Sequence, residues 1–336
     1  MKTNKNKLIR FLSACSFMTM VSCSAPLDST VKDSSADSNI SSNLNSETDK
    51  TSKPNTDKTD VETDDVSSDS CDTENVSSNK TTSNDFASNN PEWQINSYYA
   101  SKLDLSLTGA ALKTNLFKII SPHTNLGYDG LWTAYKTTDL RDDGTIWDMY
   151  SNQHFRYGTK QCGNYSKEGD CYNREHTIPQ SVFNKKAPMV SDVFHIYPTD
   201  GKINGIRSNY PHAEIGPTKN TKDNPSSNGS ALGTSNTPGY SGTAFEPIDE
   251  YKGDFARTYF YFVTCYEDKL SSFNNFAAFS KNTYPSLSSW AKTLYLKWSK
   301  EDPVSQKEID RNEAAYKLQK NRNPFIDFPG IENKIW

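Results

Sequence analysis

All six tryptophans and all eighteen tyrosines of this 336-residue chain lie after residue 92. Large aromatic side chains supply much of the apolar area that a globular core buries, so only this part of the chain can build such a core. It is about 245 residues long, which suits one large domain or two small ones. We therefore assign the folded domain to residues 91–336.

Residues 24–90 have the opposite composition. They are rich in Ser, Thr, Asn and Asp, and Phe86 is their only aromatic residue, so they cannot bury enough apolar surface to offset the entropy of ordering. Five Lys against fourteen Asp and Glu give them a net charge of −9, whereas residues 91–336 carry +1. We interpret residues 24–90 as a disordered acidic tether. The net charge of −4 for the whole chain argues against a histone-like basic binder, but it does not exclude a polyanionic partner of the domain.

Residues 1–23 have the pattern of an export signal, with four basic residues, no acidic one, and a short apolar run from Leu12 to Val21. The run ends in Met20-Val21-Ser22-Cys23, which resembles a bacterial lipobox, whose cysteine is lipidated and becomes the first mature residue. We expect a lipoprotein signal peptide with Cys23 as the lipid anchor; an ordinary secretory signal is the alternative. In either case the chain is exported, as a lipoprotein of the cell surface or periplasm, or as a secreted protein.

The apolar pattern of the domain predicts more helices than strands. Leu112, Leu116 and Ile119 follow helical spacing, and so do Trp290, Leu294 and Trp298. We expect a further helix capped by Asp302 with Pro303 at its first position, a strand over residues 145–150, and a loop over the Gly-, Ser-, Asn- and Pro-rich residues 217–243.

The cysteines of the domain predict one disulfide and one free thiol. Cys162 and Cys171 bracket a polar loop that a disulfide closes easily in an oxidising compartment; a metal clip is the alternative, but no CxxC motif accompanies the pair. Cys265 follows an apolar run and is expected to be a buried free thiol. Cys71 lies in the tether.

The residues with the clearest chemistry lie between Asn173 and Asn209, which include two of the five histidines. Glu175 offers a carboxylate beside the imidazole of His176, and Asn204 offers an amide oxygen about thirty residues later. Such oxygen ligands with several waters suit Mg²⁺. Because neighbours on a strand point to opposite faces, Glu175 and His176 can serve one site only at a strand end or a kink. Arg174 and Arg207 could hold phosphate oxygens, which indicates phosphoryl transfer on a polyanion.

At these residues the sequence resembles the bacterial endonuclease I family, whose members contain the ββα-metal, or His-Me finger, motif. The similarity extends in order over roughly residues 95–336. It is carried by residues 147–151, the loop from Cys162 to Cys171, and residues 172–180, 191–209, 245–247, 252–257 and 321–327.

The resemblance implies a role for each matching residue. His176 is the general base that deprotonates the attacking water, and Glu175 and Asn204 bind a single divalent ion. Mg²⁺ is expected, with Mn²⁺ or Ca²⁺ as alternatives, and no organic cofactor. Asn209 is the rival of Asn204 as a ligand.

Other roles remain open at this point. Arg174, Arg207 and Arg257 are the candidates for an arginine that holds the phosphate, and each is as well explained by a structural ion pair. Asp192 and His195 are expected to orient a ligand or its loop, and a purely structural buried histidine is the alternative for His195. Phe194 and Phe328 stand where many relatives carry His, but neither is a core catalytic position.

We therefore expect an α+β fold, a mainly helical domain around a ββα-metal motif. The resemblance implies a sequence-nonspecific, metal-dependent endonuclease, secreted or surface-anchored, that cleaves DNA, and by extension RNA, to 5′-phosphate and 3′-hydroxyl ends. Its partner is nucleic acid bound through the phosphate backbone, its contact with a membrane is the lipid anchor, and no protein partner is implied. The alternatives are an extracellular ribonuclease of the same family and a surface nucleic-acid-binding protein with an inactive site; intact Glu175, His176 and Asn204 favour an enzyme.

Overall fold

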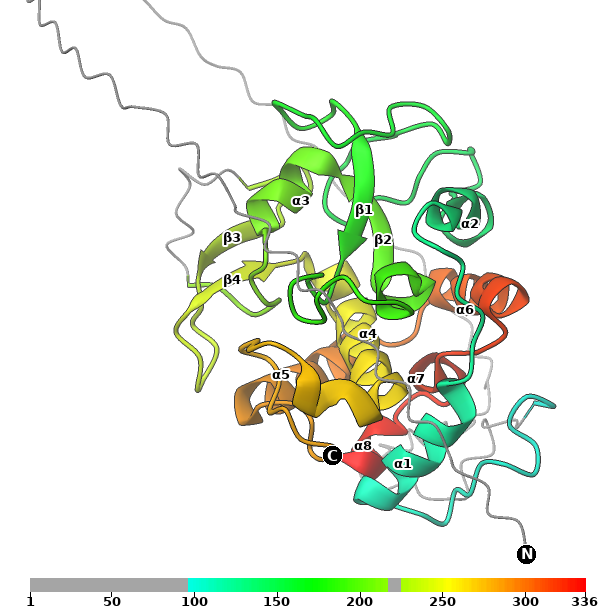
Figure 1. Ribbon diagram of the computed structural model, residues 1–336. Coiled ribbons are helices and arrows are strands. Elements are labelled where there is room, and N and C mark those ends of the chain that lie inside the picture. Colours follow the sequence, from blue (N-terminus) through cyan, green and yellow to red (C-terminus); the bar gives the residue numbers. More distant parts are fainter. Residues whose placement is uncertain (1–95, 217–224) are drawn as a thin grey trace, which may run out of the picture. The chain divides into compact units, whose positions relative to one another are not determined.

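A helix that is buried on every side lies at the centre of the domain. This helix, α4 (Lys252–Cys265), is buried at every residue from Gly253 to Cys265 in the computed structural model (Figure 1). The structure describes residues 96–216 and 225–336, all within one compact unit, Val76–Trp336. The expected signal peptide, Cys23, Cys71 and the whole tether lie outside these residues. A helix without an exposed face must be covered by other elements, and α4 organises the rest of the fold.

Helices cover most of α4. α5 (Ser289–Glu301) packs along it, α1 (Gly109–Ile120) and α7 (Pro324–Asp327) contact it, and α8 (Glu332–Ile335) packs on α1. α6 (Gln306–Gln319) packs against α2 (Gly130–Thr138). The helical spacings read from the sequence are confirmed in α1 and α5, where the predicted apolar residues are buried.

The start of α6 differs from the prediction. The helix begins at Gln306 with Ser305 as its N-cap, and Ser305 and Glu308 form a capping box that satisfies two free backbone N–H groups. Asp302 instead ends α5 and accepts a hydrogen bond from the backbone N of Gly253 at 2.7 Å. The Asp-Pro pair therefore belongs to the connection between two helices.

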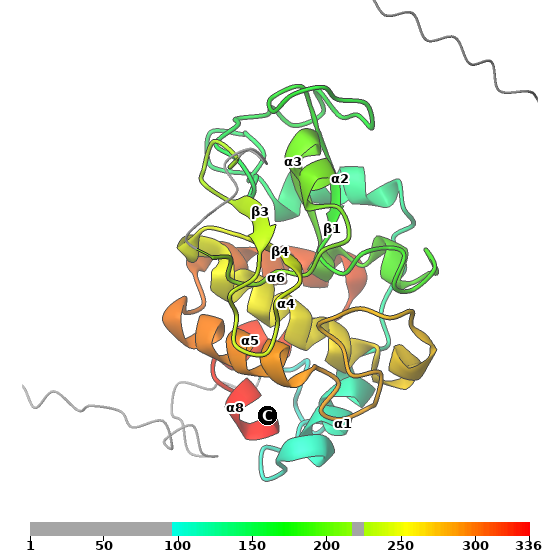
Figure 2. The ribbon, with the colours of Figure 1, turned by 90° about the vertical axis from the view of Figure 1, so that its left-hand side faces the viewer.

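Two small antiparallel sheets complete the fold. β1 (Tyr172–His176) pairs with β2 (Ile196–Asp200), and β3 (Ala231–Thr234) pairs with β4 (Thr243–Glu246). α3 (Gly201–Arg207) follows β2 without a loop and packs against both β1 and β2. Both views of the ribbon place β1, α2 and α3 on one side of α4, and α1 and α8 on the other (Figure 2). The described residues contain eight α-helices and four strands, plus four short 3₁₀ helices, Met189–Ser191, Val193–His195, Asp249–Tyr251 and Glu267–Ser272, so the mixed, mainly helical fold is confirmed.

Two further local predictions are wrong. Residues 145–150 form isolated bridges, Thr145 with Arg156 and Ile146 with Leu140, rather than a strand. The reason is that the Asp148 carboxylate accepts the backbone N–H of Tyr150 at 2.8 Å and bends the chain. The segment expected to be a loop over residues 217–243 contains β3 and the first residue of β4, and residues 217–224 lie outside the described part.

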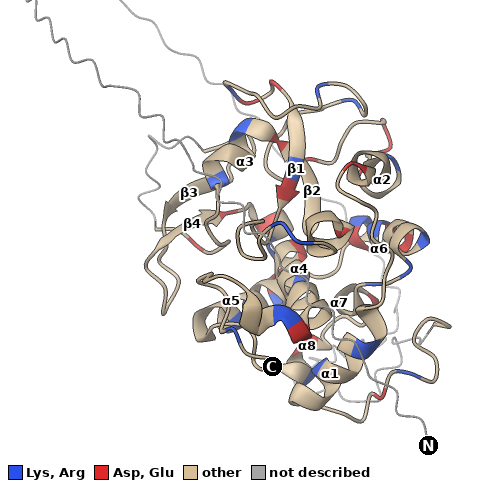
Figure 3. Cartoon of the chain, viewed as in Figure 1, with Lys and Arg blue, Asp and Glu red and all other residues tan. Residues whose placement is uncertain are grey.

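The charged residues of the described part are spread over the elements, with Lys and Arg interspersed among Asp and Glu (Figure 3). None of the helices in residues 96–216 and 225–336 has the length and apolar composition that a membrane span requires.

Candidate functional site

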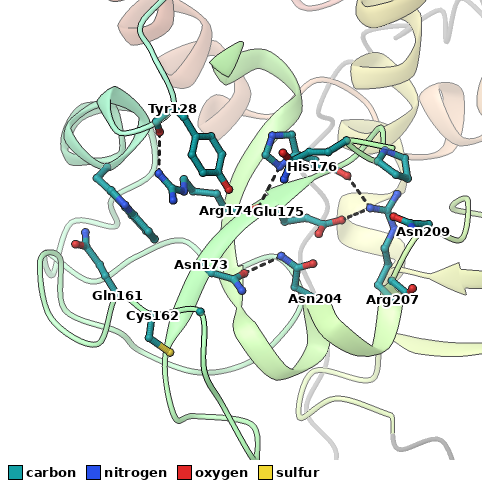
Figure 4. Close-up of a pocket in the computed structure, with 15 residues that line it drawn as sticks. Tyr128, Gln161, Cys162, Asn173, Arg174, Glu175, His176, Asn204, Arg207 and Asn209 are labelled. Atoms are coloured by element: carbon teal, nitrogen blue, oxygen red, sulfur yellow. Dashed lines mark hydrogen bonds and ion pairs between the residues drawn. The ribbon is translucent and has the colours of Figure 1, made fainter. Parts of the chain in front are cut away.

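A polar pocket of about 520 Å³ opens beside β1 and the second half of α3. Its walls come from β1, α3, the loop closed by Cys162 and Cys171, and the segment around α2 (Figure 4). Six of the residues singled out in the sequence line it together: Arg174, Glu175, His176, Asn204, Arg207 and Asn209. Elements far apart in the sequence therefore bring the predicted residues to one place.

Glu175 lies at the base of this pocket with 1 % of its surface exposed. Its Oε1 accepts hydrogen bonds from the Tyr150 hydroxyl at 2.8 Å and from Nη1 of Arg207 at 2.6 Å. Burial raises the pKa of the carboxyl, while Arg207 and Tyr150 lower it. Both of these bonds fall on one oxygen, and the second oxygen points to the side of Asn204 (Figure 4).

Asn204 presents an amide oxygen from α3 to the same pocket. Its Nδ2 donates to Oδ1 of Asn173 at 2.7 Å, which directs the amide oxygen away from Asn173. The first turn of α3 is fixed by Asp200, whose carboxylate accepts the backbone N–H groups of Lys202 and Ile203 at 2.8 and 3.0 Å. Asn209, the alternative ligand, lies just beyond α3 at the exposed rim of the pocket.

The donor set of this pocket suits a hard cation. One carboxylate oxygen and one amide oxygen, in a space large enough for water, are the ligands that Mg²⁺ prefers when it keeps much of its hydration shell. The described residues contain no group of three or more His, Cys, Asp or Glu that could hold a metal. A zinc site made by the protein alone is therefore not formed in this part of the chain.

His176 is the last residue of β1, opposite Ile196. Glu175 and His176 are consecutive, and such neighbours on a strand can serve one site only at a strand end or a kink. The position of His176 at the end of β1 meets this condition. Nε2 lies 3.2 Å from the carbonyl oxygen of Val190, and Nδ1 lies 3.3 Å from that of Arg174. Burial lowers the pKa of the imidazole to about 3. The ring is therefore neutral near pH 7, and one of its nitrogens keeps a lone pair that can accept a proton.

Arg207 and Arg174 differ in how many of their donors are occupied. Arg207 is 1 % exposed, and it donates to Glu175 Oε1, to the carbonyls of His176 and Thr177, and through Nε to that of Tyr210. Its guanidinium is committed to holding Glu175 and the end of β1. It therefore acts on the pocket through Glu175.

Arg174 retains unpaired donors. Its guanidinium carbon lies 3.5 Å from the ring centre of Tyr128 and 4.5 Å from that of Trp132. Nη1 donates to the carbonyl of Tyr128 at 2.8 Å and to Asp129 at 3.1 Å, and the other guanidinium nitrogens have no recorded partner among the described residues. Two aromatic rings thus hold a cation at the pocket with donors available for an anion.

Arg257 lies outside the pocket, contrary to its place among the catalytic candidates. It is on α4, with 1 % of its surface exposed, and its Nε and Nη2 bind the carboxylate of Glu308 at 2.6 and 2.8 Å. Nη1 donates to the carbonyl of Asp302 at 2.8 Å. Its role is to join α4 to the start of α6.

Asp192 and His195 lie behind the pocket rather than in its wall. The Asp192 carboxylate accepts the hydroxyls of Tyr261 and Tyr266 at 2.9 and 2.6 Å. Nε2 of His195 lies 2.6 Å from the carbonyl of Met189, and its ring centre is 5.8 Å from that of His176. Their hydrogen bonds hold the segment that carries the Val190 carbonyl, which lies beside His176.

Cys162 and Cys171 form the predicted disulfide, with their Cα atoms 5.8 Å apart. Cys162 and Gly163 line the pocket, so the closed loop is one of its walls. Cys265 is the predicted buried free thiol.

The sequence did not single out four residues that shape the pocket: Tyr128, Trp132, Tyr150 and Asn173. Asn173 and Tyr150 lie in blocks that resemble the endonuclease I family, and only this resemblance could have pointed to them from the sequence. Tyr128 and Trp132 precede those blocks, and no local pattern marks them.

A neutral imidazole, oxygen ligands suited to a hard cation, and a guanidinium with unpaired donors are the groups that hydrolysis of a phosphodiester requires. The fold and the pocket thus define the protein as a nuclease. The comparison with known families agrees: the Endonuclease I family model matches residues 108–330, and the chain belongs to this family.

Curated relatives are nucleases as well. The chain is 35 % identical over 248 residues to an "Extracellular ribonuclease" of Bacillus subtilis (strain 168), covering 68 % of this chain and 75 % of the relative. It is 34 % identical over 263 residues to an "Extracellular ribonuclease" of Bacillus amyloliquefaciens, covering 73 % and 80 %. An "Endonuclease-1" of Buchnera aphidicola subsp. Baizongia pistaciae (strain Bp) is 29 % identical over 136 residues, or 40 % of this chain and 46 % of the relative.

Proposed function

We propose that this nuclease is a divalent-metal-dependent endonuclease that cleaves RNA and DNA without sequence specificity, leaving 5′-phosphate and 3′-hydroxyl ends. The observation that carries the proposal is the meeting of Glu175, Asn204 and His176 in one pocket. The names of two relatives support RNA as a substrate. DNA is included because water activated by a side chain attacks phosphorus directly, so the reaction does not need a ribose 2′-hydroxyl.

Four residues of the pocket have distinct tasks in this proposal. The β1–β2–α3 unit serves as the ββα-metal motif, in which the free oxygen of Glu175 and the amide oxygen of Asn204 would bind Mg²⁺, with Mn²⁺ or Ca²⁺ as alternatives. The ion would supply charge stabilisation at the phosphate and at the leaving oxygen. Nε2 of His176 donates to the Val190 carbonyl, and Nδ1 accepts the proton of the attacking water. Arg174 donates to a non-bridging phosphate oxygen.

The test compares His176→Ala with the parent protein on plasmid DNA and on RNA, in Mg²⁺ or EDTA. Loss of the general base should slow cleavage of both polymers by roughly 10²–10⁴-fold. His154→Ala is the matched control, because His154 is 61 % exposed and does not line the pocket. We expect this control to cleave like the parent.

Two results would overturn the proposal. Equal cleavage rates for His176→Ala and the parent would show that His176 is not the general base. Full activity in EDTA would show that cleavage does not depend on a divalent metal. Analysis of the ends separates two ribonuclease mechanisms, since 2′,3′-cyclic phosphate products would mean attack by the ribose hydroxyl. Cleavage of RNA alone would favour a dedicated ribonuclease.

We also propose that the protein is exported and anchored through Cys23. The "extracellular" names of two relatives support export, and the motif ending in Cys23 supports the anchor. Metabolic labelling with a radioactive fatty acid should mark the parent and Cys71→Ser but not Cys23→Ser. Label on Cys23→Ser would contradict the anchor.

A further inference from the structure

A chain of buried hydrogen bonds runs from the pocket to the central helix. The Tyr150 hydroxyl lies 2.8 Å from Oε1 of Glu175 and 2.7 Å from Nε2 of His212. Nδ1 of His212 lies 3.1 Å from the hydroxyl of Tyr259 on α4. Tyr150, His212 and Tyr259 are each 0 % exposed, so no water competes for these bonds.

The donors and acceptors of this chain fit together in only one direction when Glu175 is ionised. A carboxylate can only accept, so Tyr150 gives its single proton to Glu175. The Tyr150 oxygen then accepts from Nε2 of His212, which places the histidine proton on Nε2. Nδ1 is left as an acceptor for the hydroxyl proton of Tyr259.

The far end of the chain is also held in place. The backbone N–H of His212 donates to the Tyr259 oxygen at 3.4 Å, and the Tyr295 hydroxyl donates to the His212 carbonyl at 3.1 Å. The imidazole stacks on Phe255, with ring centres 4.3 Å apart and planes 16° apart. His212 therefore has little freedom to move away from Tyr150.

Tyr150 determines which oxygen of Glu175 faces the pocket. Arg207 and Tyr150 both bind Oε1, at 2.6 and 2.8 Å, and this leaves Oε2 for a cation. Without the Tyr150 hydroxyl, the carboxylate can rotate so that both of its oxygens face the Arg207 guanidinium, the arrangement that carboxylates prefer with arginine. The oxygen needed by the cation would then be withdrawn.

We propose that Tyr150 and His212 are positioning residues that set the affinity of the site for its divalent ion by fixing the orientation of Glu175. This inference rests on the proposed function, because Glu175 is taken there as a metal ligand. Partners that hydrogen-bond a metal ligand typically change affinity by roughly 10- to 100-fold when removed.

The first experiment uses Tyr150→Phe in the full chain, which removes only the hydroxyl. We expect the Mg²⁺ concentration for half-maximal cleavage to rise roughly 10- to 100-fold, with kcat at saturating Mg²⁺ within about threefold of the parent. Calorimetric titration of the nucleic-acid-free protein with Mn²⁺ gives a second readout, and the Mn²⁺ dissociation constant should rise by the same factor.

Tyr197→Phe is the matched control. The Tyr197 hydroxyl is also buried and bonded, to Thr258 at 2.6 Å, but Tyr197 does not line the pocket. Its metal titrations should match those of the parent. Thermal unfolding of both variants shows whether they are folded to the same extent.

His212 provides the rescue test. In His212→Gln the amide nitrogen can replace Nε2 and still donate to Tyr150, whereas the shorter side chain of His212→Asn cannot reach it. We expect His212→Asn to weaken binding of the divalent ion as Tyr150→Phe does. His212→Gln should retain most of the parent's affinity for the ion.

Unchanged metal titrations in Tyr150→Phe, or equal losses in Tyr150→Phe and Tyr197→Phe, would overturn this inference. Equal losses of metal affinity in His212→Asn and His212→Gln would show that His212 is not a positioning residue. If the parent cleaves fully in EDTA, the proposed function itself has failed. The two failures are therefore distinguishable.

Discussion

At the scale of single residues, the surroundings of each guanidinium separate the three arginines that the sequence left equivalent. Arg257 and Arg207 are each 1 % exposed and bound to a carboxylate, Glu308 and Glu175 respectively. Arg174 is bonded through Nη1 alone, and its acidic neighbour Asp129 has a side chain that is 94 % exposed. An ion pair with so exposed a partner is weak, so the charge of Arg174 remains available to a phosphate.

Replacement of Arg174 tests this assignment. In Arg174→Lys the charge is kept, but the planar group held between Tyr128 and Trp132 is lost. We expect kcat/KM to fall about 10- to 150-fold, as the loss of one charge-assisted hydrogen bond of about 1.5–3 kcal/mol implies. Arg141→Lys is the control, because Arg141 also lies over a tryptophan, Trp147, but outside the pocket.

Steady-state kinetics on a defined oligonucleotide, repeated at several salt concentrations, measures the effect. Loss of the contact with phosphate should raise KM, whereas the salt dependence of binding should change little because lysine keeps the charge. If Arg174→Lys behaves like Arg141→Lys, Arg174 does not hold the phosphate.

At the scale of elements, α3 is placed by an unusually close contact with the disulfide loop. A Cβ atom at Gly201 would lie 2.8 Å from the ring of Tyr165, and one at Gly205 would overlap its hydroxyl oxygen. Glycine at both positions lets Tyr165 lie against the backbone of the helix. The loop that forms one wall of the pocket therefore also holds the helix that carries Asn204.

The same scale shows what the sequence could predict. α1 and α5 each have one apolar face, and this periodicity identified them. The start of α6 was misplaced because Ser305 and Glu308 cap the helix better than Asp302 does. β3 was missed because it is only four residues long, includes Gly233, and becomes a strand only through pairing with β4.

The site divides in a similar way. Glu175, His176 and Asn204 were recognisable because their chemistry is carried by the residue types themselves. Tyr128 and His212 reach the pocket and its supporting chain only through tertiary packing. No sequence pattern short of the fold could have assigned their roles.

At the scale of the whole molecule, three of the buried histidines are held neutral. Burial lowers the pKa of His176 to about 3 and that of His195 to about 4, and it lowers that of His212 well below its ordinary value. On unfolding, each imidazole regains a pKa near 6.5. The unfolded chain therefore binds more protons than the folded one in mildly acidic solution, which destabilises the fold as the pH falls.

His195 allows this linkage to be measured. Its share of the stability is fully present above pH 6.5 and is lost between pH 6.5 and about 4, at about 1.4 kcal/mol per pH unit, or roughly 3 kcal/mol in all. His195→Gln keeps a donor for the Met189 carbonyl but cannot titrate. Over this range the free energy of unfolding of the parent should therefore fall relative to that of His195→Gln.

Urea unfolding at a series of pH values, without reductant, supplies the comparison. Burial raises the pKa of Asp148 and Asp302 to about 7, so these carboxyls favour the folded state as the pH falls and oppose the histidines. They are present in both proteins and cancel in the difference. His154→Gln, at an exposed position, is the matched control for the substitution itself. If the free energy of unfolding of His195→Gln instead changes with pH as that of the parent does, His195 takes up its proton in the folded state. The conclusion that burial keeps this imidazole neutral would then be wrong.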